Sequence, residues 1–371
     1  MKMEPFKLER WLPSKKSKYG IGGACVKPLR FDELADQFDM SLEVEYGSTK
    51  GDLELREKLS ALYPGTAAED VLITIGTAEA NFLALSYLLE PGDEFAVITP
   101  TYMGSLGIAP WLGAKVKELR LSEGDGYRLD LERLKGLVGK KTTVVFVTNP
   151  NNPTSTKFSE KEIRGICDIA KEVGAYVMCD EALRGLELDG IQASSPPSIY
   201  EKGISTGSLS KLGLPGLRLG WLVARKEFAD ACWSYKDYTS LGIPVLTEHF
   251  GNIALERKNY QRIVQRARGI LKNNAQIFMD WVRKNSDYLS CVEPKAGATV
   301  FPRYNAPLES ATFCERLLAE ESVQVSPGDA FNVPKHFRLR YGGVDEKTLS
   351  EALVHLEAFL RRLSLQRVGK A

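Results

Sequence analysis

Short apolar runs alternate with longer helical segments between residues 71 and about 225, and this alternation constrains the fold more than any other feature. The runs predicted as strands are DVLITIG (70–76), DEFAVITP (93–100), TTVVFVTNP (142–150), GAYVMCDE (174–181), GISTGS (203–208) and LRLGWLVA (217–224). Most of them are too apolar to have a solvent-exposed face, which is typical of strands buried on both sides. Helices between such strands indicate crossover connections. The sequence therefore predicts an α/β fold with a mostly parallel sheet.

The rest of the chain divides into an N-terminal arm and a second domain. From about residue 262 the pattern changes to a long charged helical stretch, a strand in GATVFPRY, a helix near 308–321 and a closing helix. The closing helix has one apolar face, formed by Leu349, Leu353, Leu356, Leu360 and Leu363. We predict an arm at 1–40 that is part of the small domain, a large domain at 41–261, and a small α+β domain at 262–371.

Composition indicates that the partners of this protein are small molecules. The 371 residues suffice for a large domain plus a smaller one. A net charge of +1 gives no bias toward nucleic acid or anionic membrane. MKMEPFKLERW has no unbroken apolar stretch, and no later run approaches the length of a membrane span, so we expect a cytoplasmic protein. The six cysteines are widely spaced, and neither a metal site nor a disulfide framework is expected.

Ligands of such sheets bind outside the carboxyl ends of the strands, so the residues at these ends are candidates for a site. Gly76, Thr77 and Ala78 follow the first strand and begin a helix whose apolar stripe is expected at Ala78, Phe82, Leu85 and Leu89. The free N–H groups of a helix start attract a phosphate. A plain glycine turn is the alternative.

Three further strand ends carry polar or aromatic side chains. Tyr102 in PTYMG can stack on a flat ligand or pack in the core. Asn152 in NPNNPT can hold a ligand oxygen or simply belong to the turn. Asp180 ends an apolar run, where a buried carboxylate needs a partner; it can cap the following segment or hold a proton on a basic ring nitrogen.

Lys211 follows the strand GISTGS and lies among phosphate-binding residue types. Ser208, Ser210 and Arg218 can together bind a dianionic phosphate. With the other strand ends, this set suits a planar aromatic aldehyde that carries a phosphate and a pyridine nitrogen and forms a Schiff base with lysine.

The motifs also resemble a known family. In order, they are EYGSTKGDLELREKL, GTAEA, PTYMG, NPNNPT, DEA, SLSK with PGLRLGW, KDYTS, VSPGDAF and HFRLRYG. They resemble the class I/II aminotransferases, which are fold-type I pyridoxal-phosphate enzymes, over nearly the whole chain. The resemblance implies a seven-stranded, mostly parallel sheet between helices, a smaller α+β domain, a homodimer, and pyridoxal 5'-phosphate as cofactor.

The resemblance also implies roles for individual residues. Lys211 would form the Schiff base and move the α-proton, Asp180 would pair with the protonated pyridine nitrogen, and Tyr102 would stack on the ring. Asn152 would donate to the ring hydroxyl oxygen and belong to the substrate site.

Further residues would hold the phosphate and the substrate. The phosphate would be bound by Gly76, Thr77, Ala78, Ser208 and Arg218, and by Tyr46 from the other subunit. The α-carboxylate would be held by Arg338, and Gly22 or Gly23 would line the substrate pocket.

Two departures from the family pattern bear on function. Leu183 stands where most members have a tyrosine, three residues after the aspartate, and the interval from Lys211 to Arg218 is one residue short. We therefore predict an aminotransferase that moves an amino group from an L-amino acid to a 2-oxo acid, with a lyase, cyclase or oxidase on the same fold as the alternative. A non-catalytic sensor is the third possibility, but residues 1–40 and the C-terminal tail are too short for a DNA-binding module.

The amino acid donor is not identified by the sequence. Glu181 and Arg184 can bias the charge preference of the site or be solvated surface residues. Tyr341, Phe331 and Trp111 can line an apolar pocket or pack in the core.

Overall fold

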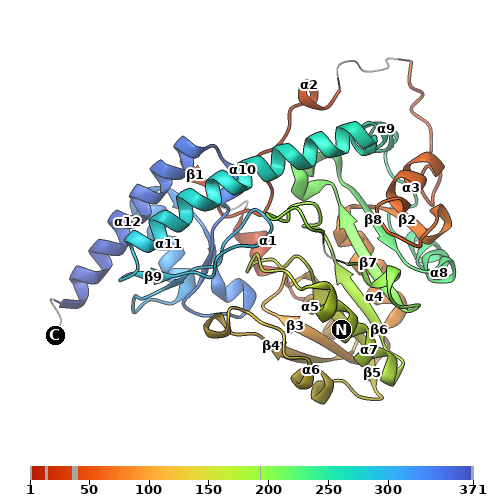
Figure 1. Cartoon of the computed structure of the whole chain (residues 1–371), viewed down its shortest axis with the longest axis horizontal. Helices are drawn as coiled ribbons and strands as arrows, with labels where there is room; N and C mark the ends of the chain where they lie inside the picture. Colours follow the sequence, from red (N-terminus) through yellow and green to blue (C-terminus); the bar gives the residue numbers. More distant parts are fainter. Residues whose placement is uncertain (1, 13–15, 36–40, 193, 369–371) are drawn as a thin grey trace.

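A seven-stranded sheet forms the centre of the computed structural model, which describes residues 2–12, 16–35, 41–192 and 194–368. Its strands, in spatial order, are β2 (Val71–Ile75), β8 (Leu219–Val223), β7 (Gly203–Ser208), β6 (Tyr176–Asp180), β5 (Thr142–Thr148), β3 (Glu94–Thr99) and β4 (Lys115–Arg120) (Figure 1). Only β8 runs against its neighbours, and every other pair of adjacent strands is parallel. The remaining six strands therefore end at the same edge of the sheet.

The six predicted strands are confirmed, but the predictions from local pattern did not include β4. This strand has the sequence KVKELR, and only Leu119 in it is buried. It lies at the edge of the sheet and pairs only with β3. An edge strand with this alternation of charged and apolar residues lacks the continuous apolar run that marks the central strands.

Helices cover both faces of the sheet. One layer is α4 (Gly76–Leu88), α5 (Gly104–Trp111) and α8 (Lys226–Lys236), and the other is α6 (Leu131–Leu137) and α7 (Glu160–Val173). Alternate residues of β5 divide between the layers: Val144 and Phe146 pack with the first, and Val145 and Val147 with the second. Burial on both sides explains why this strand is apolar from Val144 to Val147.

Local signals determine the ends of α7 as predicted. The Ser159 hydroxyl accepts a hydrogen bond from the Glu162 backbone N–H, the Glu162 carboxylate accepts one from the Ser159 N–H, and Gly174 has a left-handed φ of 78°. In α4 the predicted stripe is only partly right. Leu85 and Leu89 are buried, but Ala78 is exposed and Phe82 is half-buried, because Ala78 faces a pocket and Phe82 stacks on Trp111.

The C-terminal part is built on two long helices, α10 (Arg257–Lys284) and α12 (Glu346–Val368), which pack together in one core. In Figure 1, α10 runs from α9 (Val245–Leu255) beside the sheet to the C-terminal part. It begins five residues before the predicted start. The five leucines predicted to form one face of α12 are all buried. The other elements here are β9 (Leu289–Ser290), β10 (Arg303–Tyr304), α11 (Ser310–Glu321), β11 (Val323–Gln324), β12 (Ser326–Pro327) and β13 (Phe337–Arg338).

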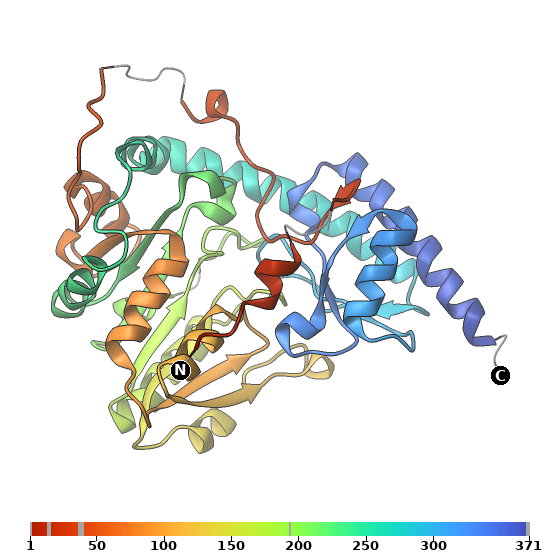
Figure 2. The ribbon, with the colours of Figure 1, turned by 180° about the vertical axis from the view of Figure 1, so that it is seen from behind.

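The N-terminal segment is attached to the C-terminal part. Strand β1 (Tyr19–Gly20) pairs in parallel with β11, and the Trp11 indole of α1 (Lys7–Trp11) donates to the Val325 carbonyl. Figure 2 shows α1 where the sheet and the C-terminal part meet. The chain then passes through α2 (Phe31–Leu34) to α3 (Leu53–Ser60), which packs on α9. The domain boundaries at 40 and 261 stay a prediction.

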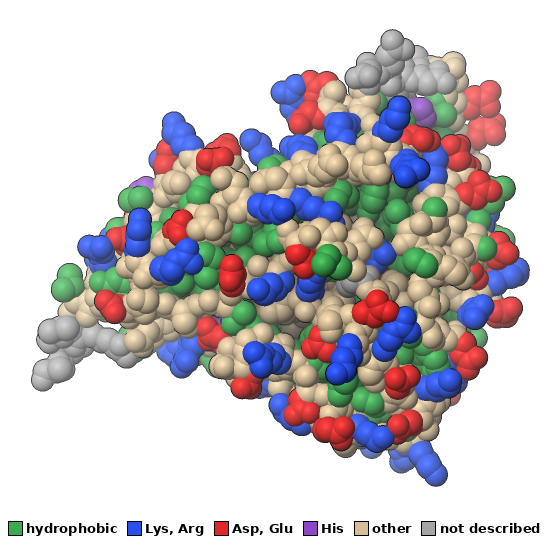
Figure 3. Space-filling model, in the orientation of Figure 1, with side chains coloured by type: hydrophobic (Ala, Val, Ile, Leu, Met, Phe, Trp, Pro, Cys, Tyr) green, Lys and Arg blue, Asp and Glu red, His purple; other side chains and the backbone are tan. Residues whose placement is uncertain are grey.

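The surface carries both signs of charge. On the face in Figure 3, basic and acidic side chains are interspersed rather than gathered into one patch. Among the described residues, no helix is long and apolar enough to cross a membrane.

Candidate active site

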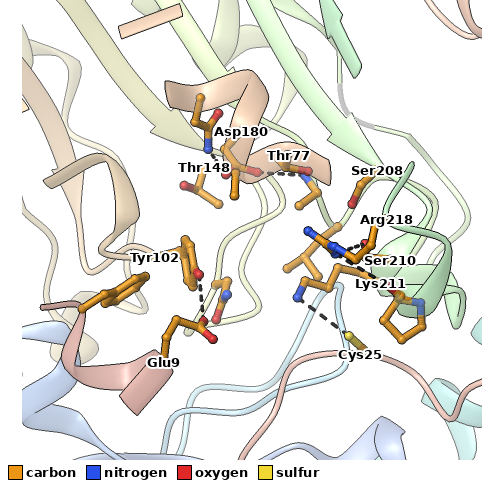
Figure 4. A pocket seen from close by; sticks show the side chains of 17 residues that line it. Glu9, Cys25, Thr77, Tyr102, Thr148, Asp180, Ser208, Ser210, Lys211 and Arg218 are labelled. Carbon is orange, nitrogen blue, oxygen red and sulfur yellow. Dashed lines mark hydrogen bonds between the residues drawn. The ribbon is translucent and has the colours of Figure 1, made fainter. Parts of the chain in front are cut away.

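A pocket of about 490 Å³ lies at the edge where six strands of the sheet end. Its lining residues come from the strand ends, from the turn that holds Lys211, and from the N-terminal segment (Figure 4). They are Phe6, Glu9, Cys25, Thr77, Ala78, Asn81, Tyr102, Thr148, Asn152, Asp180, Ala182, Leu183, Ser208, Ser210, Lys211, Pro215 and Arg218. The pocket is within the usual size range of small-molecule sites.

A buried carboxylate forms one end of the pocket. Asp180 is the last residue of β6, and its Oδ1 accepts from the Ala182 N–H at 3.0 Å. Its Oδ2 accepts from Asn81 Nδ2 at 2.9 Å, and Asn81 is held in turn by a hydrogen bond from the Thr206 hydroxyl. Burial raises the pKa of Asp180, while these two donors and the charge of Lys211 oppose the rise. Asp180 therefore caps the following turn and also faces the pocket.

A second group of lining residues, from the start of α4 to Arg218, gathers donors for an anion. Thr77, on the first turn of α4, has a buried hydroxyl with no hydrogen-bond partner in the described part of the chain. Ser208, at the end of β7, and Ser210 also belong to this group, and Ser210 Oγ accepts from Arg218 Nη1 at 3.4 Å. A hydroxyl buried without a partner is costly, and an anionic ligand would satisfy it.

Close backbone packing brings Arg218 into this group. A Cβ atom on Gly76 would lie only 2.4 Å from Arg218 Nη2, so only glycine leaves room for the guanidinium. Arg218 itself has a φ of 53°, which is uncommon for a residue with a side chain. This left-handed conformation directs the guanidinium toward the start of α4 despite the short interval from Lys211.

Lys211 enters the pocket from a short 3-10 turn, Ser210–Leu212 (Figure 4). Its ammonium nitrogen lies 3.8 Å from the Cys25 sulfur. Within the described ranges, no carboxylate comes within 4.0 Å of it. An amine without an ion-pair partner is free to react as a nucleophile once it is deprotonated.

Tyr102 forms the wall opposite Lys211. Its hydroxyl donates to Glu9 Oε1 at 2.8 Å, and its ring meets Phe6 edge-on with centroids 5.0 Å apart. Burial and the Glu9 charge raise the pKa of Tyr102, so the phenol stays protonated. The ring contributes a flat, neutral surface to the pocket.

Arg338 lies directly behind the pocket wall rather than on it. Its side chain is only 1% exposed and donates to Asn152 Oδ1 at 3.1 Å and to the Gly22 carbonyl at 2.8 Å. Burial lowers the pKa of Arg338 to about 10, and Nε has no hydrogen-bond partner among the residues described. No carboxylate of the described chain pairs with it. A buried cation without a counter-ion is strongly suited to bind an anion.

Not every predicted site residue is in this pocket. Tyr46 is 91% exposed and lies outside the lining, as the expected role in a second subunit would require. Gly22 contributes its carbonyl to Arg338, while Gly23 packs beside Arg340.

Other residues considered from the sequence have different surroundings. Glu181 and Arg184 are not solvated surface residues: they form a buried ion pair of 3.3 Å outside the pocket lining. Tyr341 and Phe331 are fully packed in the core.

Seven lining residues were not singled out from the sequence: Phe6, Glu9, Cys25, Asn81, Thr148, Ala182 and Pro215. Phe6, Glu9 and Cys25 come from the N-terminal segment, far along the chain from the strand ends, and no local pattern relates them to the sheet. Asn81 had a usable signal, because it is a polar residue on the buried face of an otherwise apolar helix.

Comparison with known proteins identifies the family. Residues 31–356 match the family model described as aminotransferase class I and II. The chain belongs to this family. Members of the class I and II aminotransferases are pyridoxal-phosphate enzymes, and the fold is that of aspartate aminotransferase.

Similar proteins within this fold differ in their named activities. Capreomycidine synthase of Streptomyces vinaceus is 29% identical over 90% of this chain and 88% of its own length. A pyridoxal-phosphate-dependent aminotransferase from Streptococcus suis 89-1591 superposes with a TM-score of 0.92, 32% identity, and coverage of 98% of this chain and 99% of that one. The pyridoxal-phosphate-dependent cyclase OrfR has a TM-score of 0.88, 26% identity, and coverage of 98% of both chains. Family membership therefore does not choose between amino transfer and cyclisation.

Proposed function

We propose that the protein is a pyridoxal-phosphate-dependent aminotransferase that moves an amino group from an L-amino acid to a 2-oxo acid, with Lys211 as its attachment point. The observation that carries this proposal is that one pocket holds Lys211 together with a buried carboxylate, Asp180, and with candidate anion donors that include the unpartnered Thr77 hydroxyl. Pyridoxal phosphate has a basic ring nitrogen at one end and a phosphate at the other. The residues present fit both ends.

In this proposal the cofactor supplies an electron sink for the α-carbon of the amino acid. Thr77, Ser208, Ser210 and Arg218 hold its phosphate. Asp180 keeps a proton on the ring nitrogen, and its donors keep the carboxylate ionised against the effect of burial.

Other residues orient the substrate and move its proton. Arg338, held by Asn152 and Gly22, binds the α-carboxylate through its planar guanidinium. Tyr102 would cover one side of the reacting group, and the amine of Lys211 would take the proton from the α-carbon of the substrate. Each step uses a side chain that lines the pocket or lies directly behind it.

The assembly and cellular setting extend the proposal. We propose a cytoplasmic homodimer in which Tyr46 reaches the phosphate of the other subunit. The high exposure of Tyr46 supports this role, and all six cysteines are free, as is usual in reducing compartments.

Cyclisation is the second candidate function. Leu183 lines the pocket with a buried side chain that has no hydrogen-bonding group, where most aminotransferases have a tyrosine. The likeness to the cyclase OrfR over nearly all of both chains also favours this candidate.

A spectroscopic experiment tests both functions. Amino acids are added one at a time to the cofactor-loaded protein while its visible absorption is followed, and a 2-oxo acid is then added. An aminotransferase converts the bound cofactor to its aminated form and is restored by the oxo acid. Return of the original spectrum without an oxo acid, with a cyclic product detected by mass spectrometry, supports the cyclase instead. Lys211→Ala should abolish turnover, and repeated turnover by this variant would refute the role of Lys211.

A further inference from the structure

We propose that Glu9 recognises a cationic side chain, so that the substrate of this enzyme is a basic amino acid. This inference rests on the proposed function, because it names the substrate class of the same site. It concerns a carboxylate that neither the cofactor nor the α-carboxylate of an amino acid uses.

The charged side chains that line the pocket within the described residues are Glu9, Asp180, Lys211 and Arg218. In the proposed function, Asp180 pairs with the ring nitrogen of the cofactor, Lys211 forms the covalent bond to it, and Arg218 binds its phosphate. The substrate carboxylate goes to Arg338. Only Glu9 is left without a role in binding or chemistry, and it is a negative charge in the part of the pocket that the substrate must enter.

The geometry leaves this carboxylate available to a ligand. Figure 4 shows Glu9 beside Tyr102 and across the pocket from Lys211. Its Oε1 accepts from the Tyr102 hydroxyl, and in the described part of the chain neither oxygen has an ion-pair partner within 4.0 Å. Glu9 forms no ion pair with Arg338 within 4.0 Å among these residues, although its charge is near enough to oppose the effect of burial on the pKa of Arg338.

Two aromatic rings line the pocket near this carboxylate. Phe6 lines the pocket one helical turn before Glu9, and its ring contacts the Tyr102 ring. A carboxylate attracts a cation through its charge, and the nearby aromatic rings can add cation–π contact. The Phe6 and Tyr102 rings also offer apolar surface that suits the methylene stem of a long basic side chain. An acidic side chain of the substrate would instead be repelled by the negative charge of Glu9.

The position of Glu9 is set by the packing of α1. Leu8, the preceding residue, is fully buried in the core beside the sheet. At the other end of α1, the Trp11 indole is bonded to the C-terminal part. A carboxylate on a helix anchored at both sides is presented to the pocket at little entropic cost.

The test compares amino acids of matched shape and different charge. Arginine and citrulline differ at the terminal group, as do lysine and norleucine. Dissociation constants are measured by calorimetry on the cofactor-loaded protein, and kcat/KM is measured for every amino acid that reacts. We expect the charged member of each pair to be preferred by roughly tenfold or more, because hydrogen bonds to charged groups are worth more than neutral ones.

Glu9→Gln isolates the charge from the structural role. Glutamine retains an oxygen that can accept from Tyr102, so α1 should stay in place. The preference for arginine over citrulline should fall to within about threefold in this variant, while the values for citrulline and norleucine stay near those of the wild type. Glu4→Gln is the matched control, because Glu4 is an exposed glutamate of the same segment outside the pocket lining.

The outcomes separate this inference from the proposed function. Equal binding of arginine and citrulline by the wild type would overturn the role of Glu9 and leave the proposed function standing. A Glu9→Gln variant that weakens every amino acid equally would show that Glu9 only anchors α1, and would overturn it as well. If no amino acid alters the bound cofactor, the proposed function fails and the inference fails with it.

Discussion

The hydrogen bond from Asn81 to Asp180 allows a quantitative test of the site. Both side chains are buried, at 5% and 4% exposure, and Asn81 Nδ2 lies 2.9 Å from Asp180 Oδ2. Asn81→Leu removes this donor with little change in volume. A hydrogen bond to a buried charged group is worth about 1.5–3 kcal/mol, which corresponds to about 1–2 pKa units. The Ala182 N–H and the charge of Lys211 remain and limit the effect.

The direction of the expected change in the pH profile follows from the ionised state of Asp180, which the proposed reaction requires. Asp180 must be ionised to hold a proton on the cofactor ring, and burial already raises its pKa. Loss of the Asn81 donor raises this pKa further, so the acidic limb of the pH profile of kcat/KM should move upward by about one unit or more. The affinity for pyridoxal phosphate, measured at neutral pH, should fall by roughly tenfold.

Stability of the cofactor-free protein provides a second readout. Because the folded pKa of Asp180 lies above the unfolded value, its contribution to stability is full below the unfolded pKa and is lost as the pH rises through the folded pKa. Asn81→Leu enlarges this loss. Relative to wild type, the variant should therefore become less stable from acidic to neutral pH in thermal denaturation.

Phe82→Leu serves as the control, since Phe82 adjoins Asn81 but lies outside the pocket lining. An Asn81→Leu enzyme with wild-type pH profile and cofactor affinity would refute the argument that Asn81 tunes Asp180.

Two further predictions concern the departures from the family pattern. Leu183→Tyr should add a donor to the ring oxygen of the cofactor and lower the pKa of the imine that Lys211 forms with it; this is read as a pH titration of the visible band, with Leu183→Phe as the control lacking the hydroxyl. An unchanged titration would show that position 183 does not reach the ring oxygen. Arg218→Ala should weaken cofactor binding by roughly tenfold to a hundredfold, because it removes a charged donor from the phosphate end. Unaltered equilibrium binding of the cofactor would mean that Arg218 does not contact the phosphate.

The parts of the fold and site that the sequence predicts are those determined by local pattern. Continuous apolar runs identify the central strands because both faces are buried, and the ends of parallel strands must meet at one edge. Tyr102, Asn152, Asp180 and Lys211 therefore lie together around one pocket, as their positions after strands predicted. Their chemical roles stay predictions.

The parts that the sequence does not predict depend on contacts between distant segments. Glu9 reaches the pocket only because its helix is held between the sheet and the C-terminal part, which no spacing near residue 9 encodes. The charge pair of Glu181 and Arg184 looks like ordinary surface sequence, but it is buried under residues far away in the chain, including the Leu62 carbonyl and the Tyr63 ring. Edge strand β4 was not predicted because it is largely exposed, so its sequence lacks the continuous apolar run of a buried strand.

The residues proposed to bind the substrate come from different parts of the molecule than those proposed to bind the cofactor. The residues proposed for the cofactor come from the sheet and its turns. Arg338 belongs to the C-terminal part, and the segment that carries Glu9 is fastened to that part through β1 and Trp11. The same segment also contacts the sheet side, through buried Leu8 and through the hydrogen bond that Glu9 accepts from Tyr102. The position of Glu9 relative to Arg338 therefore depends on both parts of the molecule, and a rotation of the C-terminal part against the sheet would change their separation or break one of these contacts.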